Sequence, residues 1–324
     1  MTALQGYDTY LKLAVEAAWG DGTTPSVSIP ILSENLKPDM DMRIRESELN
    51  ASRFPSTPMT GRQWTAGGAV LNAYPDIIGY FLLAMYGTPT VDEVASGVYD
   101  NTFEPGVAID KSLSLEVSKG GANPLMIAGY NANKLNWTQG KEGAAQILTL
   151  GFDGGGKFAT EGSPSSFTAP STSPLSFHEA VMTVASATAY LDSCQWSETN
   201  GLMQPNHKIS GGAAALEPSL SGSFAGEGSF VLDFEDLDNW DNFRQATDVA
   251  LSLVYTTTQA IETGYYYTLT ITVPKVRFRN PLPDIGSRDL VKETINFDMF
   301  AGTVGASTVP ISYKLRCGTD FSAL

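Results

Sequence analysis

The sequence has very few of the residues on which catalysis and metal binding usually depend. Its 324 residues include two cysteines and two histidines. Cys194 and Cys317 are too few for a disulfide framework or a zinc cluster. His178 and His207 are not accompanied by a Gly-x-Ser-x-Gly elbow or a His-Glu-x-x-His pair. We therefore expect no enzymatic activity, no metal and no cofactor.

Long apolar runs and charged residues are also scarce. No stretch approaches the roughly 20 uninterrupted apolar residues of a membrane-spanning helix, and Met1–Leu13 lacks the basic start and apolar run of a signal peptide. We expect neither a membrane span nor export. The net charge of -15 argues against wrapping nucleic acid, because binding to phosphates requires Lys and Arg. Only 17% of residues are charged, which suits a surface that partners cover.

Two segments could be taken for ligand sites. The acidic run Asp233–Asp241 could bind calcium, but it lacks the glycine and the terminal glutamate of an EF-hand loop. A strand that passes into a helix N-terminus, where carboxylates are favoured, explains it better. Asp153–Lys157 is glycine-rich like a phosphate loop but lacks the second half of that motif. We interpret it as a flexible tether.

The periodicity of the sequence predicts a mainly β protein. Apolar and polar residues alternate over Tyr265–Val273, Leu113–Val117 and Thr294–Met299, as expected of strands. Because one face of these strands is apolar and the other polar, we expect antiparallel sheets with one side on a core.

Helix signals are few. Pro75–Tyr86 begins with a proline at a tolerated position, has apolar residues along one face and is followed by Gly87. A second helix is expected to begin near Asp238, a natural N-cap, and to dock through Trp240 and Phe243.

The order of these features occurs twice, before and after a Gly/Ser/Pro-rich stretch. This repetition predicts two tandem β-sandwich or barrel domains, each with one flanking α-helix, over residues 1–155 and 178–324, joined by a linker at 156–177. Chance similarity between two β-rich halves is the alternative. The paired segments are Gly68–Leu71 with Gly228–Leu232, Asn133–Trp137 with Pro274–Phe278, and the runs that end at Phe152 and Phe300.

Charge of both signs is concentrated in the polar segment Lys37–Gln63. It is either a solvated loop or an arm that contacts another subunit, where arginine forks meeting carboxylates would fix the register. The matching segment of the second half, Gln204–Ser223, is Gly/Ala-rich and almost uncharged. The candidate contact residues of the arm are Arg43, Arg45, Glu46, Glu48, Arg53 and Arg62.

Several segments together resemble the tail tube proteins, or major tail proteins, of long-tailed bacteriophages. They are Ile31–Leu36, the Arg/Glu-rich segment through Arg53, Tyr74–Gly87, Phe234–Phe243 and Thr272–Phe278. The resemblance covers nearly the whole chain. It rests on turns and aromatic residues and includes no catalytic signature.

The resemblance implies a β-sandwich unit that assembles into six-fold rings, which stack as a hollow tube in the virion tail. The family commonly has one unit per chain, whereas this chain repeats its pattern twice. We therefore expect three chains per pseudo-six-fold ring. A hexamer whose second units decorate the outside is the alternative.

The same resemblance implies the partners and the surroundings. They are other tail proteins, such as the terminator, the tape measure and the tail tip, and DNA that passes through the lumen without specific binding. Assembly would take place in the host cytoplasm. On this hypothesis Arg45, Arg53 and Arg62 meet acidic groups on the next ring, and carboxylates in the lumen repel phosphates.

Two other classes remain open. A capsid-decoration protein would assemble but never polymerise end to end. An extracellular β-sandwich binding module would explain the aromatics and turns, but it should carry an export signal.

Overall fold

Strands dominate the computed structural model. It describes residues 6–43, 59–106, 109–120, 123–209, 212–279, 281–283, 285 and 290–324. In this part of the chain, 19 strands join one antiparallel network, and two α-helices pack on it. The prediction of a mainly β fold is confirmed.

The first half of the chain forms one series of strands. Its members are β1 (Thr9–Glu16), β2 (Val27–Ile29), β3 (Ile31–Glu34), β4 (Lys37–Arg43), β5 (Met59–Asn72), β8 (Ser112–Lys119), β9 (Leu125–Gly140) and β10 (Thr149–Gly156). They pair in the order β2, β1, β8, β9, β10 and β5, with β3 and β4 following one another along the far edge of β5.

The second half repeats this order. Its strands are β12 (Ala180–Val184), β13 (Ala187–Ala189), β14 (Leu191–Thr199), β17 (Ala225–Asp233), β18 (Val249–Glu262), β19 (Tyr265–Arg279) and β20 (Lys292–Met299). They pair in the order β13, β12, β18, β19, β20, β17 and β14. In this order β14 has the place that β3 and β4 have in the first series.

The register of the two edge pairs is the same, including a bulge. In the first series Ile31 lies opposite Leu71 and Ser33 opposite Val70, with the shift between them. In the second, Leu191 lies opposite Leu232 and Ser193 opposite Val231, with the shift at the same step. At the far end Asp39 faces Trp64, and Thr199 faces Ala225. Asp39 therefore corresponds to Thr199.

In the described residues, two strand pairings and a short parallel bridge between Gln63 and Ala214 join the halves. β14 lies antiparallel beside the second part of β9, from Thr199 opposite Lys134 to Ser193 opposite Gly140. β23 (Ser312–Cys317) pairs with both β19 and β7 (Val98–Phe103), which belongs to the first half. The halves therefore share one sheet network and one apolar core.

Each helix follows the strand that ends its edge pair. α1 (Ile78–Tyr86) comes after β5 and packs on β9, and α2 (Asp238–Arg244) comes after β17 and packs on β19. Eight of the nine residues of α1 are buried, so its burial extends beyond the one apolar face that the sequence pattern predicts. Gly87, with φ 84°, ends it as expected. α2 begins at Asp238, which is its first helical residue and not its cap.

The glycine-rich segment Asp153–Gly156 is not a tether. It forms the end of β10 and pairs with β5 on one side and β9 on the other. A Cβ atom at Gly154 would lie 2.1 Å from the carbonyl oxygen of Asn131. Glycine is therefore required here because two backbones approach closely.

The polar face of β8 is buried against neighbouring parts of the chain. Ser112 and Ser114 each donate a 2.6 Å hydrogen bond to the buried carboxylate of Glu16. Glu116 accepts hydrogen bonds from the Ser165 hydroxyl at 2.7 and 2.8 Å. The segment that follows β10 therefore runs back over β8 and covers it.

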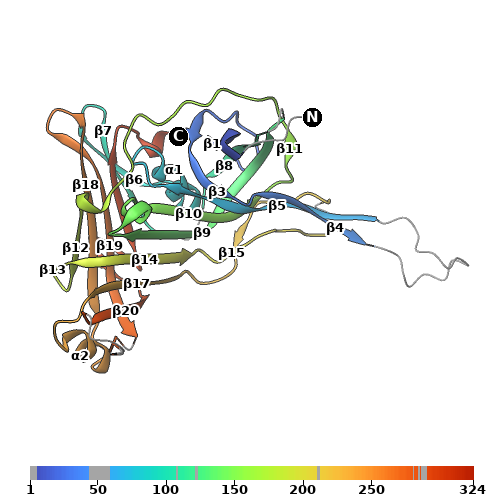
Figure 1. The fold of residues 1–324 in the computed structure, drawn as a ribbon. Helices are drawn as coiled ribbons and strands as arrows, with labels where there is room; N and C mark the ends of the chain where they lie inside the picture. The colour runs from blue at the N-terminus through green and yellow to red at the C-terminus, as the bar shows by residue number, and fades with distance from the viewer. Residues whose placement is uncertain are drawn as a thin grey trace, which may run out of the picture.

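The remaining elements are short. The strands are β6 (Thr90–Ala95), β11 (Thr160–Glu161), β15 (Leu202–Met203), β16 (Ser219–Leu220), β21 (Gly302–Val304) and β22 (Ser307–Val309), and the 3-10 helices are Gly6–Asp8, Gly143–Gln146, Phe177–Glu179 and Phe321–Ala323. Figure 1 shows β4 and the start of β5 as a hairpin that projects from the body of the molecule.

Candidate functional site

The projecting hairpin is the first candidate for a contact between subunits. Of the six predicted arm residues, Arg43 ends β4 and Arg62 lies on β5. The Arg62 Nε atom donates to the Asp41 Oδ2 atom at 2.7 Å, and its guanidinium lies 5.7 Å from the centre of the Trp64 ring. Arg62 therefore braces the two strands of the hairpin. The other four, Arg45, Glu46, Glu48 and Arg53, lie outside the described residues.

The outer edge of β3 and β4 is the second candidate. In the described part of the chain each of these strands pairs only with β5. Leu32, Lys37, Pro38 and Asp39 are exposed along this edge, as is Met42 farther out. An edge with unpaired backbone groups invites another strand.

The contact between β9 and β14 shows what such an edge looks like when it is covered. The Trp137 and Trp196 rings stack at 5.6 Å with an interplanar angle of 13°, and Trp137 also stacks on Tyr313 at 5.6 Å. The Trp196 Nε1 atom donates to the Tyr313 hydroxyl at 2.9 Å. Aromatic residues from both halves therefore form the centre of this contact.

A buried carboxylate lies beside this aromatic stack. Glu198 on β14 has no exposed surface, and the hydroxyls of Tyr86 and Tyr313 both donate to it. Burial raises the pKa of Glu198 to about 7, although these hydrogen bonds oppose the shift. The carboxyl therefore changes charge near neutral pH, at the boundary between the two halves.

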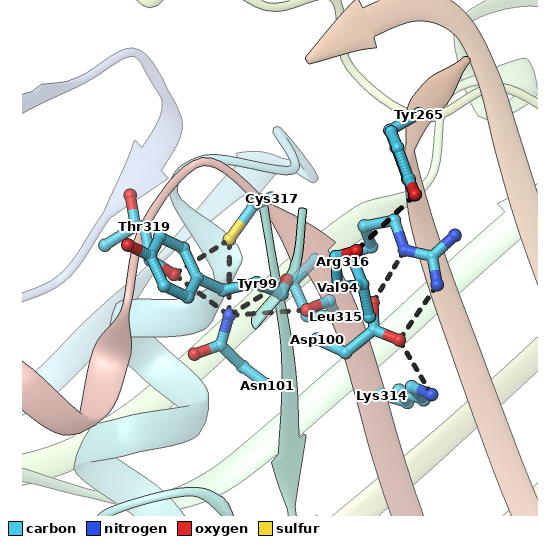
Figure 2. A network of polar contacts seen from close by, with 10 residues as sticks. All are labelled: Val94, Tyr99, Asp100, Asn101, Tyr265, Lys314, Leu315, Arg316, Cys317 and Thr319. Carbon is cyan, nitrogen blue, oxygen red and sulfur yellow. Dashed lines mark hydrogen bonds and ion pairs between the residues drawn. The ribbon is translucent and has the colours of Figure 1, made fainter. Parts of the chain in front are cut away.

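A second polar network holds β23 on β7. Asp100 is buried, and its carboxylate accepts hydrogen bonds from Arg316 at 2.6 and 2.9 Å and lies 2.8 Å from the Lys314 Nζ atom. Burial acts to raise the pKa of Asp100, but the bonds from Arg316 and Lys314 outweigh it and lower that pKa. Figure 2 shows both basic side chains reaching Asp100 from β23.

The neighbouring Asn101 points to the other side of β7 in Figure 2. Its Nδ2 atom donates to the Thr319 carbonyl at 3.0 Å, and its Oδ1 atom accepts from the Phe321 backbone N–H at 3.0 Å. β7 therefore holds both β23 and the residues that follow it, Thr319 and Phe321.

Sequence reasoning missed Glu198, Asp100 and Asn101. The signal for Glu198 was present, because Cys194, Trp196 and Glu198 alternate as the inward face of one strand. A carboxylate in such a position requires buried partners. The partners of Asp100 lie more than 200 residues away along the chain, and no local pattern connects them.

The acidic run covers the end of β17, the connection that follows it and the first turn of α2. The Asp236 Oδ1 atom accepts from the Asp238 backbone N–H at 2.9 Å, and Asp241 pairs with Arg244 at 2.9 Å. These contacts agree with the structural interpretation. Within the described residues, no group of three or more His, Cys, Asp or Glu side chains is placed to hold a metal ion.

The histidines and cysteines lie apart from one another. His178 contacts the Ser176 hydroxyl at 3.0 Å on the surface, and His207 lies 3.3 Å from the Gln63 carbonyl. Cys194 and Cys317 are buried free thiols, and burial raises the pKa of each to about 12. Such thiols are unreactive near neutral pH.

No helix in the described part of the chain is long and apolar enough to cross a membrane. A search of curated proteins found no match. The family model described as phage tail tube protein matches residues 6–299. This family is structural and not enzymatic, and its members are components of the virion tail. Because the match covers most of its length, the chain belongs to the phage tail tube protein family.

Proposed function

We propose that this chain is a fusion of two tail tube units and that three chains close each ring of the tube. The observation that carries the proposal is the repeated strand order, in which each pairing of the first series has a counterpart in the second. The shared bulge at Ser33 and Ser193 supports it. Unrelated β domains have no reason to place the same irregularity at the same step.

Three chains of two units give six similar positions around a ring. A closed ring covers the sheet edges that would otherwise pair without limit. In the alternative hexamer, the second unit of each chain lies outside the tube. It then has no need to keep the strand order of the first unit. The close integration of the halves through β14 and β23 favours the ring of three.

The tube extends when rings stack, and the β4–β5 hairpin is our candidate for that contact. It projects from the body of the molecule (Figure 1), as a contact with a neighbouring ring requires. Its arginines would meet carboxylates on that ring. The net charge of -15 supports an acidic bore that DNA passes without sticking. The terminator, tape measure and tail tip proteins would contact the ends and lumen of this tube.

Electron microscopy of the purified protein at rising concentration tests this function. Hollow tubes of uniform bore are expected, and mass measurement of single rings should give three chains. Isolated trimers that never stack would point to a capsid-decoration protein. Monomers that persist at high concentration would contradict assembly altogether.

The arm is tested in the same assay. Reversing the charge of Arg45 and Arg53 together should leave rings intact but prevent stacking, whereas Arg62 is kept because it pairs with Asp41 on β4. Arg244→Glu serves as the matched control, because that exposed arginine pairs with Asp241 on α2. Tubes of normal length from the double variant would exclude Arg45 and Arg53 as the inter-ring contact.

A further inference from the structure

We infer that β4 of one chain pairs antiparallel with the end of β19 of a neighbouring chain, placing Asp39 opposite Arg279 and Asp41 opposite Arg277. The contact repeats between chains the one that β14 and β9 make within a chain. This inference rests on the proposed two-unit ring. It names the two strand edges that close the ring and the register in which they meet.

The first step is the correspondence of the two acceptor strands. On β10, Asp153 lies opposite Gly68 on one side and Lys134 on the other. On β20, Asn296 lies opposite Ser229 on one side and Arg279 on the other. Gly68 lies three residues before Leu71, and Ser229 lies three residues before Leu232. Because Leu71 and Leu232 lie opposite equivalent bulges, Gly68 and Ser229 are equivalent positions. Arg279 therefore corresponds to Lys134.

The second step transfers the contact. Within one chain, Thr199 of β14 lies opposite Lys134 of β9. Asp39 corresponds to Thr199 by the shared register of the edge pairs. In a ring, first and second units alternate, so the second unit of one chain meets the first unit of the next chain. If that contact has the register of the contact between β9 and β14, Asp39 of one chain faces Arg279 of its neighbour. The contact between β14 and β9 ends at the equivalent pair, Thr199 with Lys134. Extending the antiparallel pairing by two residues places Asp41 opposite Arg277.

The charges in this register are complementary, although charge had no part in deriving it. Two carboxylates on β4 meet two guanidinium groups on β19. Within one chain, Arg279 also pairs with Asp298 and Glu227, and Asp41 with Arg62, so the new pairs add to existing ones. Opposite charges directly across an antiparallel pair stabilise it, and like charges oppose it. Complementary charges also select the correct partner edge over others.

Both edges are accessible in the single chain. Asp39 is exposed, and the side chains of Arg277 and Arg279 are 48% and 53% exposed. Beyond Val276, no strand pairs with the β18 side of β19 in the described residues. Arg277 donates its Nε atom to Asp248 at 2.9 Å, and Arg279 donates to Asp298 at 2.7 Å and to Glu227 at 3.3 Å. Each guanidinium has further N–H donors for another carboxylate. Met42 and Phe300 add exposed apolar surface beside the two edges.

Cysteine cross-linking tests the register directly. Asp39→Cys and Arg279→Cys in one chain should form disulfides between neighbouring chains on mild oxidation, giving a ladder on a denaturing gel that ends at three chains. The native Cys194 and Cys317 are buried, and burial raises their pKa to about 12, so they should not contribute. Asp39→Cys with Asp92→Cys, an exposed site on β6, is the control and should give no ladder.

Charge reversal tests the complementarity. Asp39→Lys with Asp41→Lys should reduce the assembled fraction by about tenfold, as should Arg277→Glu with Arg279→Glu, because each brings like charges together. All four substitutions in one chain should restore part of the lost assembly, because the cross-strand pairs attract again. Recovery stays incomplete because the new side chains face like charges of their own chain at Arg62, Asp248 and Asp298. Asp92→Lys with Glu93→Lys is the matched control and should assemble normally. Thermal unfolding of each variant monitors the fold.

The outcomes separate this inference from the proposed function. If the native chain forms tubes but the Asp39→Cys and Arg279→Cys pair gives no ladder, the register is wrong and the tube role stands. If the native chain forms no rings or tubes, the proposed function itself fails. If a charge-reversal variant unfolds, the cysteine cross-link alone decides whether the register is correct. Failure of the fourfold variant to recover, with each reversal folded, would overturn the charge pairing.

Discussion

The outer edge of β14 and the outer edge of β3 and β4 follow the same register but have opposite surroundings. β14 is covered by β9, and its Glu198 is fully buried. Pro38, the counterpart of Glu198 on β4, is exposed. The difference teaches that the covering strand, and not the edge itself, decides what is buried. In the proposed ring both edges are covered, one within the chain and one between chains.

The free edge also has features that limit indiscriminate pairing. Pro38 lacks a backbone N–H, and Lys37, Asp39 and Asp41 place charge along the strand. Prolines and charges on edge strands discourage aggregation. A partner with matched charge is therefore favoured over a random strand.

Removing an aromatic side chain from the contact between β9 and β14 should have the largest effect on stability. Trp137 is fully buried between Trp196 and Tyr313, and Trp137→Ala is expected to lower the free energy of unfolding by about 3–5 kcal/mol. Denaturant unfolding of the monomer measures this. Tyr190→Ala, at a site that is 88% exposed, should change it by less than about 0.5 kcal/mol. Equal effects at both sites would mean that β9 and β14 do not depend on this stack.

Glu198 should make the covered edge sensitive to pH. Its pKa is raised from 4.5 to about 7 by burial, so the folded state holds a proton that the unfolded state releases. The stabilisation is complete below about pH 4.5 and is lost as pH rises through about 7, a change of about 3 kcal/mol.

Unfolding measured from pH 4.5 to pH 8 tests this dependence. Glu198→Gln should flatten the curve and raise stability at pH 8, because no charge is then buried. Glu235→Gln, at an exposed site, is the control and should keep the native slope. The predicted sign is wrong if the native protein gains stability between pH 5 and pH 7 and Glu198→Gln abolishes that gain.

Sequence patterns found the strands and helices that follow a regular period. Tyr265–Val273, Leu113–Val117 and Thr294–Met299 all lie within strands, and both helices exist. The order of the repeated segments was also visible, because it depends on local features. Period and order are set by each segment alone, and so they can be read without the fold.

Register and burial could not be read in the same way. The sequence pattern pairs the run ending at Phe152 in the first half with the run ending at Phe300 in the second. The strand pairings instead make Phe152 equivalent to Ile295. The glycines of Asp153–Gly156 suggest a tether, because the sequence does not show the two backbones that approach them. These properties are set by contacts between distant segments.

The second contact between the halves should respond less strongly than the first. Asp100→Asn removes the charge that Arg316 and Lys314 face. Because those two side chains are partly exposed, the expected loss is about 1–3 kcal/mol. Asp241→Asn, which breaks an exposed pair with Arg244, should cost less than about 0.5 kcal/mol. Equal losses in urea unfolding would show that burial of Asp100 has no consequence.

The same substitution should alter the acid side of the stability curve. The pKa of Asp100 is lowered below 3.8, so its contribution is present above that value and is lost as pH falls through the lowered pKa. Asp100→Asn should remove this acid-dependent loss.

The smallest change in the monomer should come from the bulge of the free edge. Leu32 is 59% exposed, and its counterpart Asp192 binds Lys141, which follows β9, at 2.5 Å. Leu32→Ser should alter monomer stability by less than about 0.5 kcal/mol. Assembly should nevertheless weaken by about twofold to fivefold, because apolar surface that becomes covered in the ring is lost. Leu220→Ser, at a partly exposed site on β16, is the control. Sedimentation at matched concentration compares the two, and equal assembly would mean that the bulge of β3 stays uncovered in the ring.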